Sequence, residues 1–221
     1  MVAQQATPAR APRPFPPAQF IPDHNFDTRH IALNLRFDWD TEQVIGTETI
    51  ILAPLVNNLD HIELDAANMT FSSVKLSSGS SLKYENDVPH EKLLITLDHP
   101  YQPSQELTLL IDYRTNGLAN KDRITGLTGG GIRFIKPTAD DPNRPKQIWS
   151  QGESEYNHHW FPCYDHPNDF FTSELTATVS KPLSVVSNGK LVQTKENQDG
   201  TRTFHWSIEQ PHASYLSSII V

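Results

Sequence analysis

The chain has 221 residues and a formal net charge of -8, with a pI near 5.6. This length is enough to bury a core in one large β domain or two small domains. The negative charge argues against a nucleic-acid partner, because nucleic-acid-binding surfaces neutralise phosphates with lysine and arginine. No apolar run approaches the roughly 18 residues of a membrane span, so we expect a soluble chain, either cytoplasmic, or secreted or periplasmic after removal of a signal.

Proline dominates the first part of the chain. Residues 1–26 contain little periodic apolar sequence and six prolines: Pro8, Pro12, Pro14, Pro16, Pro17 and Pro22. This composition favours an extended, polyproline-like arm over a packed element. We therefore expect residues 1–26 to form an arm or linker and residues 27–221 to form the folded domain.

From residue 28 the sequence alternates in the manner of a half-buried β-strand, with Ile31, Leu33 and Leu35 on one face. A polar link at residues 40–43 suits a hairpin into a second strand over residues 44–52, which is rich in β-branched residues. Further strands are expected at residues 59–64, 69–76, 93–97, 107–113, 132–135, 175–179, 191–194, 203–208 and 216–221. Because no 3.6-residue periodicity interrupts them, the sequence predicts an all-β sandwich or large open sheet.

Two segments only partly match known motifs. His90 and Glu91 begin an HEKLL string, but Leu94 stands where a zinc-binding HExxH motif needs its second histidine. Glycines at positions 126 and 129–131 form a glycine-rich loop with neither P-loop nor GxGxxG spacing. We interpret the first segment as the entry to a strand and the second as a turn.

The stretch of residues 149–176 contains four side chains that are chemically able to bind zinc: His158, His159, Cys163 and His166. The two adjacent histidines would point to opposite faces of an extended chain, and prolines brace the segment on both sides of Cys163. We therefore interpret the histidines as hydrogen-bonding groups and the cysteine as a small buried residue. The sequence predicts neither a metal site nor a catalytic thiol here.

Gln151 and Glu153 offer a different chemistry. Residues two apart in an extended segment project to the same side, so this amide and this carboxylate would present paired acceptors. A free peptide N-terminus is an ammonium below a pKa of about 7.7 to 8.0, and such a pair suits it. The alternative is a solvated polar face on an edge strand.

Several motifs in order resemble one known family. Gln151-Gly-Glu153 is followed by FPCYDHP at residues 161–167, by Phe171 within an alternating strand, and by VSNG at residues 186–189. This series is similar to the N-terminal domain of the aminopeptidase N family of zinc metallopeptidases, over about residues 27–221. The resemblance implies a saddle-like, mostly antiparallel β domain that precedes a thermolysin-like catalytic domain.

The resemblance also implies roles for individual residues. Gln151 and Glu153 inherit the binding of the substrate's free amino end. A structural brace is implied for a second set: Phe161, Pro162, Cys163, Asp165 and Pro167. The family often has arginine where this sequence has His158, which makes an ion pair at that position dependent on pH.

The family's catalytic motifs are missing from this sequence. Neither an HExxH motif with its downstream glutamate nor a GAMEN-type loop occurs in the 221 residues. The resemblance therefore implies zinc bound outside this chain, no catalytic or metal-binding residue within it, and no peptidase activity of the chain alone. The apolar strand at its end is interpreted as a cut at a domain boundary.

Two functions of other classes stay open. A relative of the family could keep the β saddle as a non-catalytic scaffold or interaction module. A carbohydrate-binding sandwich would instead use exposed aromatic side chains, for which Trp149, Tyr156 and Trp160 are the candidates.

Overall fold

The computed structural model describes residues 20–117 and 131–221. Most of the expected proline-rich arm, residues 1–19, and the glycines at positions 126, 129 and 130 lie outside the described residues. The first strand begins at Phe26, one residue before the expected start of the domain. The boundary between arm and domain stays a prediction.

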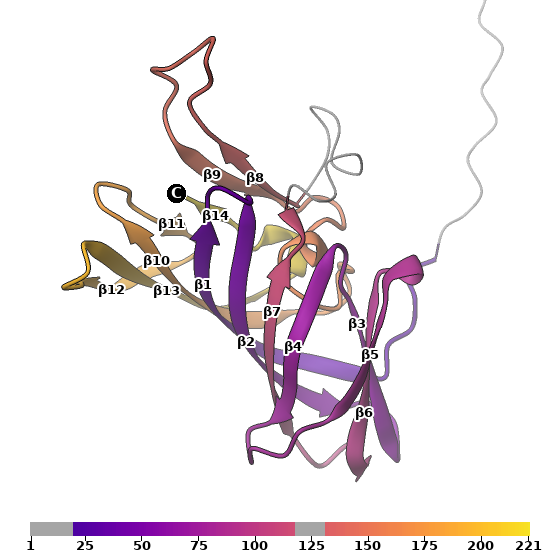
Figure 1. The fold of residues 1–221 in the computed structure, drawn as a ribbon. Helices are drawn as coiled ribbons and strands as arrows, with labels where there is room; N and C mark the ends of the chain where they lie inside the picture. Colours follow the sequence, from indigo (N-terminus) through magenta and orange to yellow (C-terminus); the bar gives the residue numbers. More distant parts are fainter. Residues whose placement is uncertain (1–19, 118–130) are drawn as a thin grey trace, which may run out of the picture.

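A seven-stranded sheet forms the centre of the fold, in the order β12-β13-β10-β1-β2-β7-β4 (Figure 1). Its neighbouring strands are antiparallel except for β1 and β10, which run parallel with Leu33 opposite Leu175. The bounds of its strands are β1 Phe26–Asp38, β2 Gln43–Pro54, β4 Met69–Leu76, β7 Leu107–Thr115, β10 Phe171–Ser180, β12 Lys190–Glu196 and β13 Thr201–His212. The predicted all-β, mostly antiparallel fold is confirmed.

Two smaller sheets accompany the central one; in Figure 1 the four-stranded sheet lies in the upper part of the view and the three-stranded sheet at the lower right. A four-stranded sheet has the order β11-β14-β9-β8, with β8 Gly131–Ile135, β9 Gln147–Gln151, β11 Val186–Ser187 and β14 Ile219–Ile220. A three-stranded sheet has the order β3-β6-β5, with β3 Leu59–Asp65, β5 Lys83–Asp87 and β6 Lys92–Tyr101.

The 3-10 turns that lie wholly within the described residues are η1 Val88–His90, η3 Asn157–His159 and η4 Ser214–Leu216. The expected last strand, residues 216–221, is therefore shorter than predicted, because the chain makes η4 before it joins β9 through β14. Within the described part of the chain, no helix has the length and apolar character needed to cross a membrane.

One continuous core joins the central sheet to the segment of residues 157–171. Trp160 and Phe161 are fully buried within it. The hydroxyl of Tyr113 on β7 donates a hydrogen bond of 2.9 Å to the main-chain oxygen of Trp160. The segment that carries the motifs is therefore packed into the fold and does not form a loose surface loop.

Candidate functional site

The two predicted anchors lie at the end of β9. Gln151 is the last residue of the strand, and Glu153 lies in the turn that follows, where the main-chain N–H of Tyr156 donates to the oxygen of Gly152 at 2.9 Å. Both side chains are exposed. The expectation that Glu153 continues an extended segment is wrong, because the chain turns at Gly152 and the alternation of side chains ends there.

The structure still brings Gln151 and Glu153 close together. The side-chain amide of Gln151 donates to the main-chain oxygen of Glu153 at 3.5 Å, the limit of a hydrogen bond. In the described part of the chain, the carboxylate of Glu153 has no hydrogen bond or ion pair. The turn therefore presents an unneutralised carboxylate beside an amide side chain.

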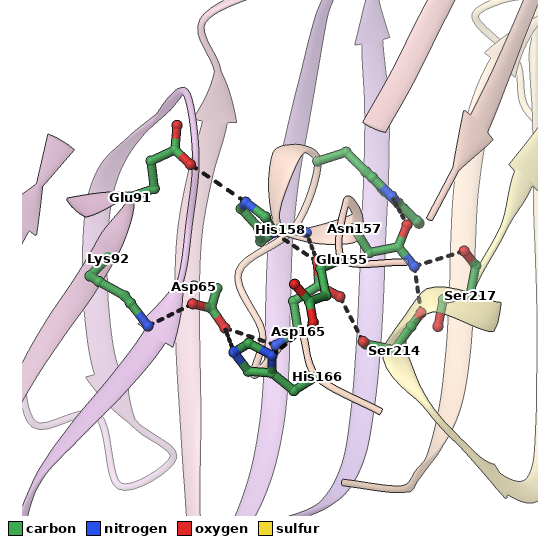
Figure 2. Close-up of polar contacts among 11 residues, drawn as sticks. Asp65, Glu91, Lys92, Glu155, Asn157, His158, Asp165, His166, Ser214 and Ser217 are labelled. Carbon is green, nitrogen blue, oxygen red and sulfur yellow. Dashed lines mark hydrogen bonds and ion pairs between the residues drawn. The ribbon is translucent and has the colours of Figure 1, made fainter. Parts of the chain in front are cut away.

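A buried amide lies directly below this turn. Asn157, at the start of η3, is fully buried. Its Nδ2 donates to the main-chain oxygens of Ser214 and Ser217, the latter at 3.0 Å, and its Oδ1 accepts from Nε1 of Trp160 at 2.7 Å (Figure 2). Asn157 thus links the turn after β9 to the η4 turn near the end of the chain.

His158 and Asp165 form a largely buried pair in the same network (Figure 2). Nδ1 of His158 and its main-chain N–H both bond Oδ2 of Asp165, at 2.7 and 3.0 Å, and Oδ1 of Asp165 accepts from the hydroxyl of Ser214 at 2.6 Å. On the other side, Nε2 of His158 lies 3.7 Å from a carboxylate oxygen of Glu91. The pair therefore joins Glu91, the residue between η1 and β6, to η4.

The environment of this pair sets its ionisation. Burial lowers the pKa of His158, but the hydrogen bond and charge of Asp165, with the charges of Asp65 and Glu91, raise this pKa above its ordinary value overall. Burial raises the pKa of Asp165, but hydrogen bonds from His158 and Ser214 bring it below its ordinary value. Both shifts favour an ion pair of imidazolium and carboxylate. The pH-dependent ion pair expected for His158 thus has a defined partner.

Asp65 is the second acidic centre of the network. It accepts from the main-chain N–H of Asp165 at 2.9 Å and pairs with Lys92 at 2.7 Å. His166 lies 4.0 Å from Asp65 and bonds Glu155 at 3.2 Å. These contacts connect β3 and β6 to the motif segment.

The candidate zinc ligands are engaged in other contacts. His158 bonds Asp165, His166 bonds Glu155, and the rings of His158 and His159 lie 4.4 Å apart in η3. Cys163 is fully buried, and its burial with the nearby charge of Asp165 raises the pKa of its thiol well above the ordinary value. Within residues 20–117 and 131–221, no three such side chains gather so that they could hold a metal ion. The described residues therefore do not fit a zinc site.

The predicted brace is confirmed for most of its members. Phe161, Pro162, Cys163 and Asp165 are buried, and Cys163 forms a two-way main-chain bridge with Asp65, at 2.7 and 3.1 Å. Pro167 is exposed, so its assignment to packing is wrong. It lies in the turn that leads to the buried Asp169 and limits the backbone there.

The aromatic residues proposed for carbohydrate binding do not share one surface. Trp160 is fully buried and donates to Asn157, whereas Tyr156 is exposed and Trp149 is half-buried. A stacking platform needs accessible ring faces, so the carbohydrate hypothesis loses one of its two tryptophan candidates.

Sequence reasoning missed Asn157, Ser214 and Ser217. Their contacts join positions about 60 residues apart. The acceptors at Ser214 and Ser217 are main-chain oxygens, which every residue type has, so the sequence does not mark them. The one available signal was Asn157 itself, a polar residue placed between two charged or aromatic neighbours in the motif segment.

Comparisons with known proteins agree on one family. The sequence profile of the Peptidase M1 N-terminal domain matches residues 24–216. Leucine aminopeptidase 2 of Vanderwaltozyma polyspora is 25% identical over 198 residues, 88% of this chain and 28% of that protein. Transcription initiation factor TFIID subunit 2 of Gallus gallus is 32% identical over 95 residues, 42% of this chain and 8% of that protein. The chain thus spans only a minor part of these curated relatives.

A solved structure shares the fold. An M1 zinc metallopeptidase variant from Deinococcus radiodurans, bound to a Tyr-Ser-Ala substrate, superposes with a TM-score of 0.74 at 20% identity, over 89% of this chain and 42% of that chain. At this identity the likeness establishes the fold alone. Together with the profile match over residues 24–216, it completes the assignment: this chain belongs to the Peptidase M1 N-terminal domain family.

Proposed function

We propose that this chain is the substrate-anchoring domain of a zinc-dependent aminopeptidase, an enzyme that removes residues from the N-terminus of peptides. A thermolysin-like catalytic domain outside these 221 residues would hold the zinc, and the chain alone would be inactive. Family membership, an aminopeptidase relative and a family structure that holds a tripeptide support this proposal.

The observation that carries the proposal is the unneutralised carboxylate of Glu153 beside Gln151. An α-ammonium bound there would complete a charge-assisted hydrogen bond, worth about 1.5 to 3 kcal/mol. Such a contact would place the first peptide bond at a fixed distance from the anchor, which limits cleavage to one residue from the end. The anchors supply orientation and perform no bond breaking themselves.

The test uses the full-length protein and the substitution Glu153→Ala. Loss of the ammonium contact should lower kcat/KM for free-amine peptides by about 10- to 100-fold. Glu155→Ala is the matched control, because Glu155 is an exposed glutamate of the same turn whose carboxylate already bonds His166. Unchanged kinetics of Glu153→Ala would remove Glu153 from the site and refute the proposal.

The second candidate is a non-catalytic scaffold, which the similarity to a transcription initiation factor subunit favours. Zinc content and peptide hydrolysis of the full-length protein separate the two functions. A protein that hydrolyses free-amine peptides with stoichiometric zinc is the peptidase. A folded protein with neither property is the scaffold.

A further inference from the structure

The backbone between the two anchors rests on the buried amide of Asn157. A Cβ added to Gly152 would lie 2.7 Å from both Nδ2 and Oδ1 of Asn157 and 2.5 Å from the main-chain oxygen of Tyr215. Real Cβ atoms do not approach other atoms so closely, so only glycine fits without a shift of the chain. Gly152 is thus in direct contact with the amide and with η4.

The orientation of this amide is fixed by its own hydrogen bonds. Both donor positions of Nδ2 face main-chain oxygens, of Ser214 and Ser217, while Oδ1 faces the indole N–H of Trp160. A flipped amide would place its oxygen against two carbonyl oxygens, and no donor would face the indole N–H. Asn157 therefore offers Gly152 a rigid surface with a single orientation.

The anchors themselves have little other support. In the described part of the chain, the one side-chain hydrogen bond of Gln151 is its 3.5 Å bond to the main chain of Glu153, and the Glu153 carboxylate has neither a hydrogen bond nor an ion pair. Their placement is therefore set by the backbone on either side of Gly152. Binding groups need to be held within a fraction of an ångström by a supporting layer of packed residues.

We propose that Asn157 is a positioning residue that, through Gly152, sets where Gln151 and Glu153 present their side chains to the peptide N-terminus. This inference rests on the proposed anchoring function and extends it to a buried residue that does not touch substrate. Because Asn157 bonds Ser214 and Ser217, the same contact ties the anchoring turn to the end of the chain.

The test is a double-mutant cycle in the full-length protein. Gly152→Ala inserts a methyl group between the turn and Asn157 and should lower kcat/KM for free-amine peptides by roughly 10- to 100-fold, because misplaced binding groups lose orientation. In a Gln151→Ala/Glu153→Ala background there is no anchor left to misplace, so the same substitution should cost less than about threefold. Asn157→Ser shortens the supporting side chain without adding bulk, and it should likewise lower kcat/KM strongly with the anchors present and little without them. It replaces Gly152→Ala in the cycle if that variant does not fold.

The outcomes separate this inference from the proposed function. A purely structural role would give equal losses in both backgrounds, and that result would overturn the inference while leaving the anchors in place. No loss for Gln151→Ala/Glu153→Ala would instead overturn the anchoring function and the inference with it. Ser187→Ala is the control: it removes a 2.7 Å bond to the main-chain oxygen of Ser218 without touching the anchoring turn, and its kinetics should match those of the unmodified protein.

Discussion

Glu48 on β2 makes the stability of this domain depend on pH. Its side chain is fully buried between Leu33 of β1 and Ile111 of β7, and neither carboxyl oxygen has a hydrogen-bond partner among the described residues. Burial raises the pKa of Glu48 well above its ordinary value of 4.5. The folded chain therefore keeps a proton that the unfolded chain has released at neutral pH.

The size of the effect follows from this difference in proton binding. Because the folded-state pKa of Glu48 is raised, the free energy of unfolding falls as pH rises above 4.5. The fall is about 1.4 kcal/mol per pH unit over the range in which Glu48 is protonated in the folded state and ionised in the unfolded state. Glu48→Gln keeps the shape of the side chain and removes the proton, so it should stabilise the fold progressively above pH 4.5.

Urea unfolding at pH 4.5, 5.5 and 6.5 tests this reasoning. Glu48→Gln should match the unmodified chain at the lowest pH, and its advantage in free energy of unfolding should grow as pH rises, by at most about 1.4 kcal/mol per pH unit. Glu85→Gln, a substitution at an exposed position of β5, is the matched control and should change little. Equal destabilisation by Glu48→Gln at every pH would refute this prediction. It would mean that Glu48 is ionised in the folded chain and bound to a partner that this structure does not contain.

Two further predictions concern the motif segment. Cys163, whose burial raises the pKa of its thiol, should react with a disulfide reagent at pH 8 at least about 100-fold more slowly in the native chain than in urea, and rapid native labelling would contradict its burial. Asp165→Asn should lower the free energy of unfolding by about 3 kcal/mol at pH 6. The raised pKa of His158 means that, while Asp165 is ionised, the pair stabilises fully below pH 6.5 and loses its contribution as pH rises through the folded-state value of His158, so the penalty measured by urea unfolding should be smaller at pH 9.

Alternation of apolar residues was sufficient to find most of the sheet. β1 and β2 follow the predicted pattern because each buries one face, and a period of two then shows directly in the sequence. β5 was missed because its five residues are exposed or half-buried, so no apolar face marks them. The parallel pairing of β1 with β10 was also missed, since it joins residues about 140 positions apart and no local signal records it.

The candidate site was predictable only in part. Gln151 and Glu153 came from the motif and from their resemblance to a family, and the structure places them side by side on an exposed turn. The turn that follows Gly152 was not predicted, because the close packing of Gly152 against Asn157 and against Tyr215, which is more than 60 residues away, is not visible in a local pattern. The alternation of residues in a sequence predicts the conformation of a segment by itself, whereas the backbone at Gly152 is packed against other parts of the chain.

The site divides between residues that the fold requires and residues that it does not. Hydrogen bonds join Asn157, His158 and Asp165 to one another's segment and to η4, so substitutions there lower the stability of the fold as well, and their presence alone does not indicate peptidase function. Glu153 is exposed and its carboxylate has no hydrogen bond or ion pair among the described residues, so folding gives no reason for a carboxylate there. A substitution at Glu153 should therefore change substrate binding while hardly changing the free energy of unfolding. In a scaffold protein, the same substitution should have as little effect as any other surface substitution. For this reason Glu153 decides between the two proposed functions more cleanly than any buried residue of the motif segment.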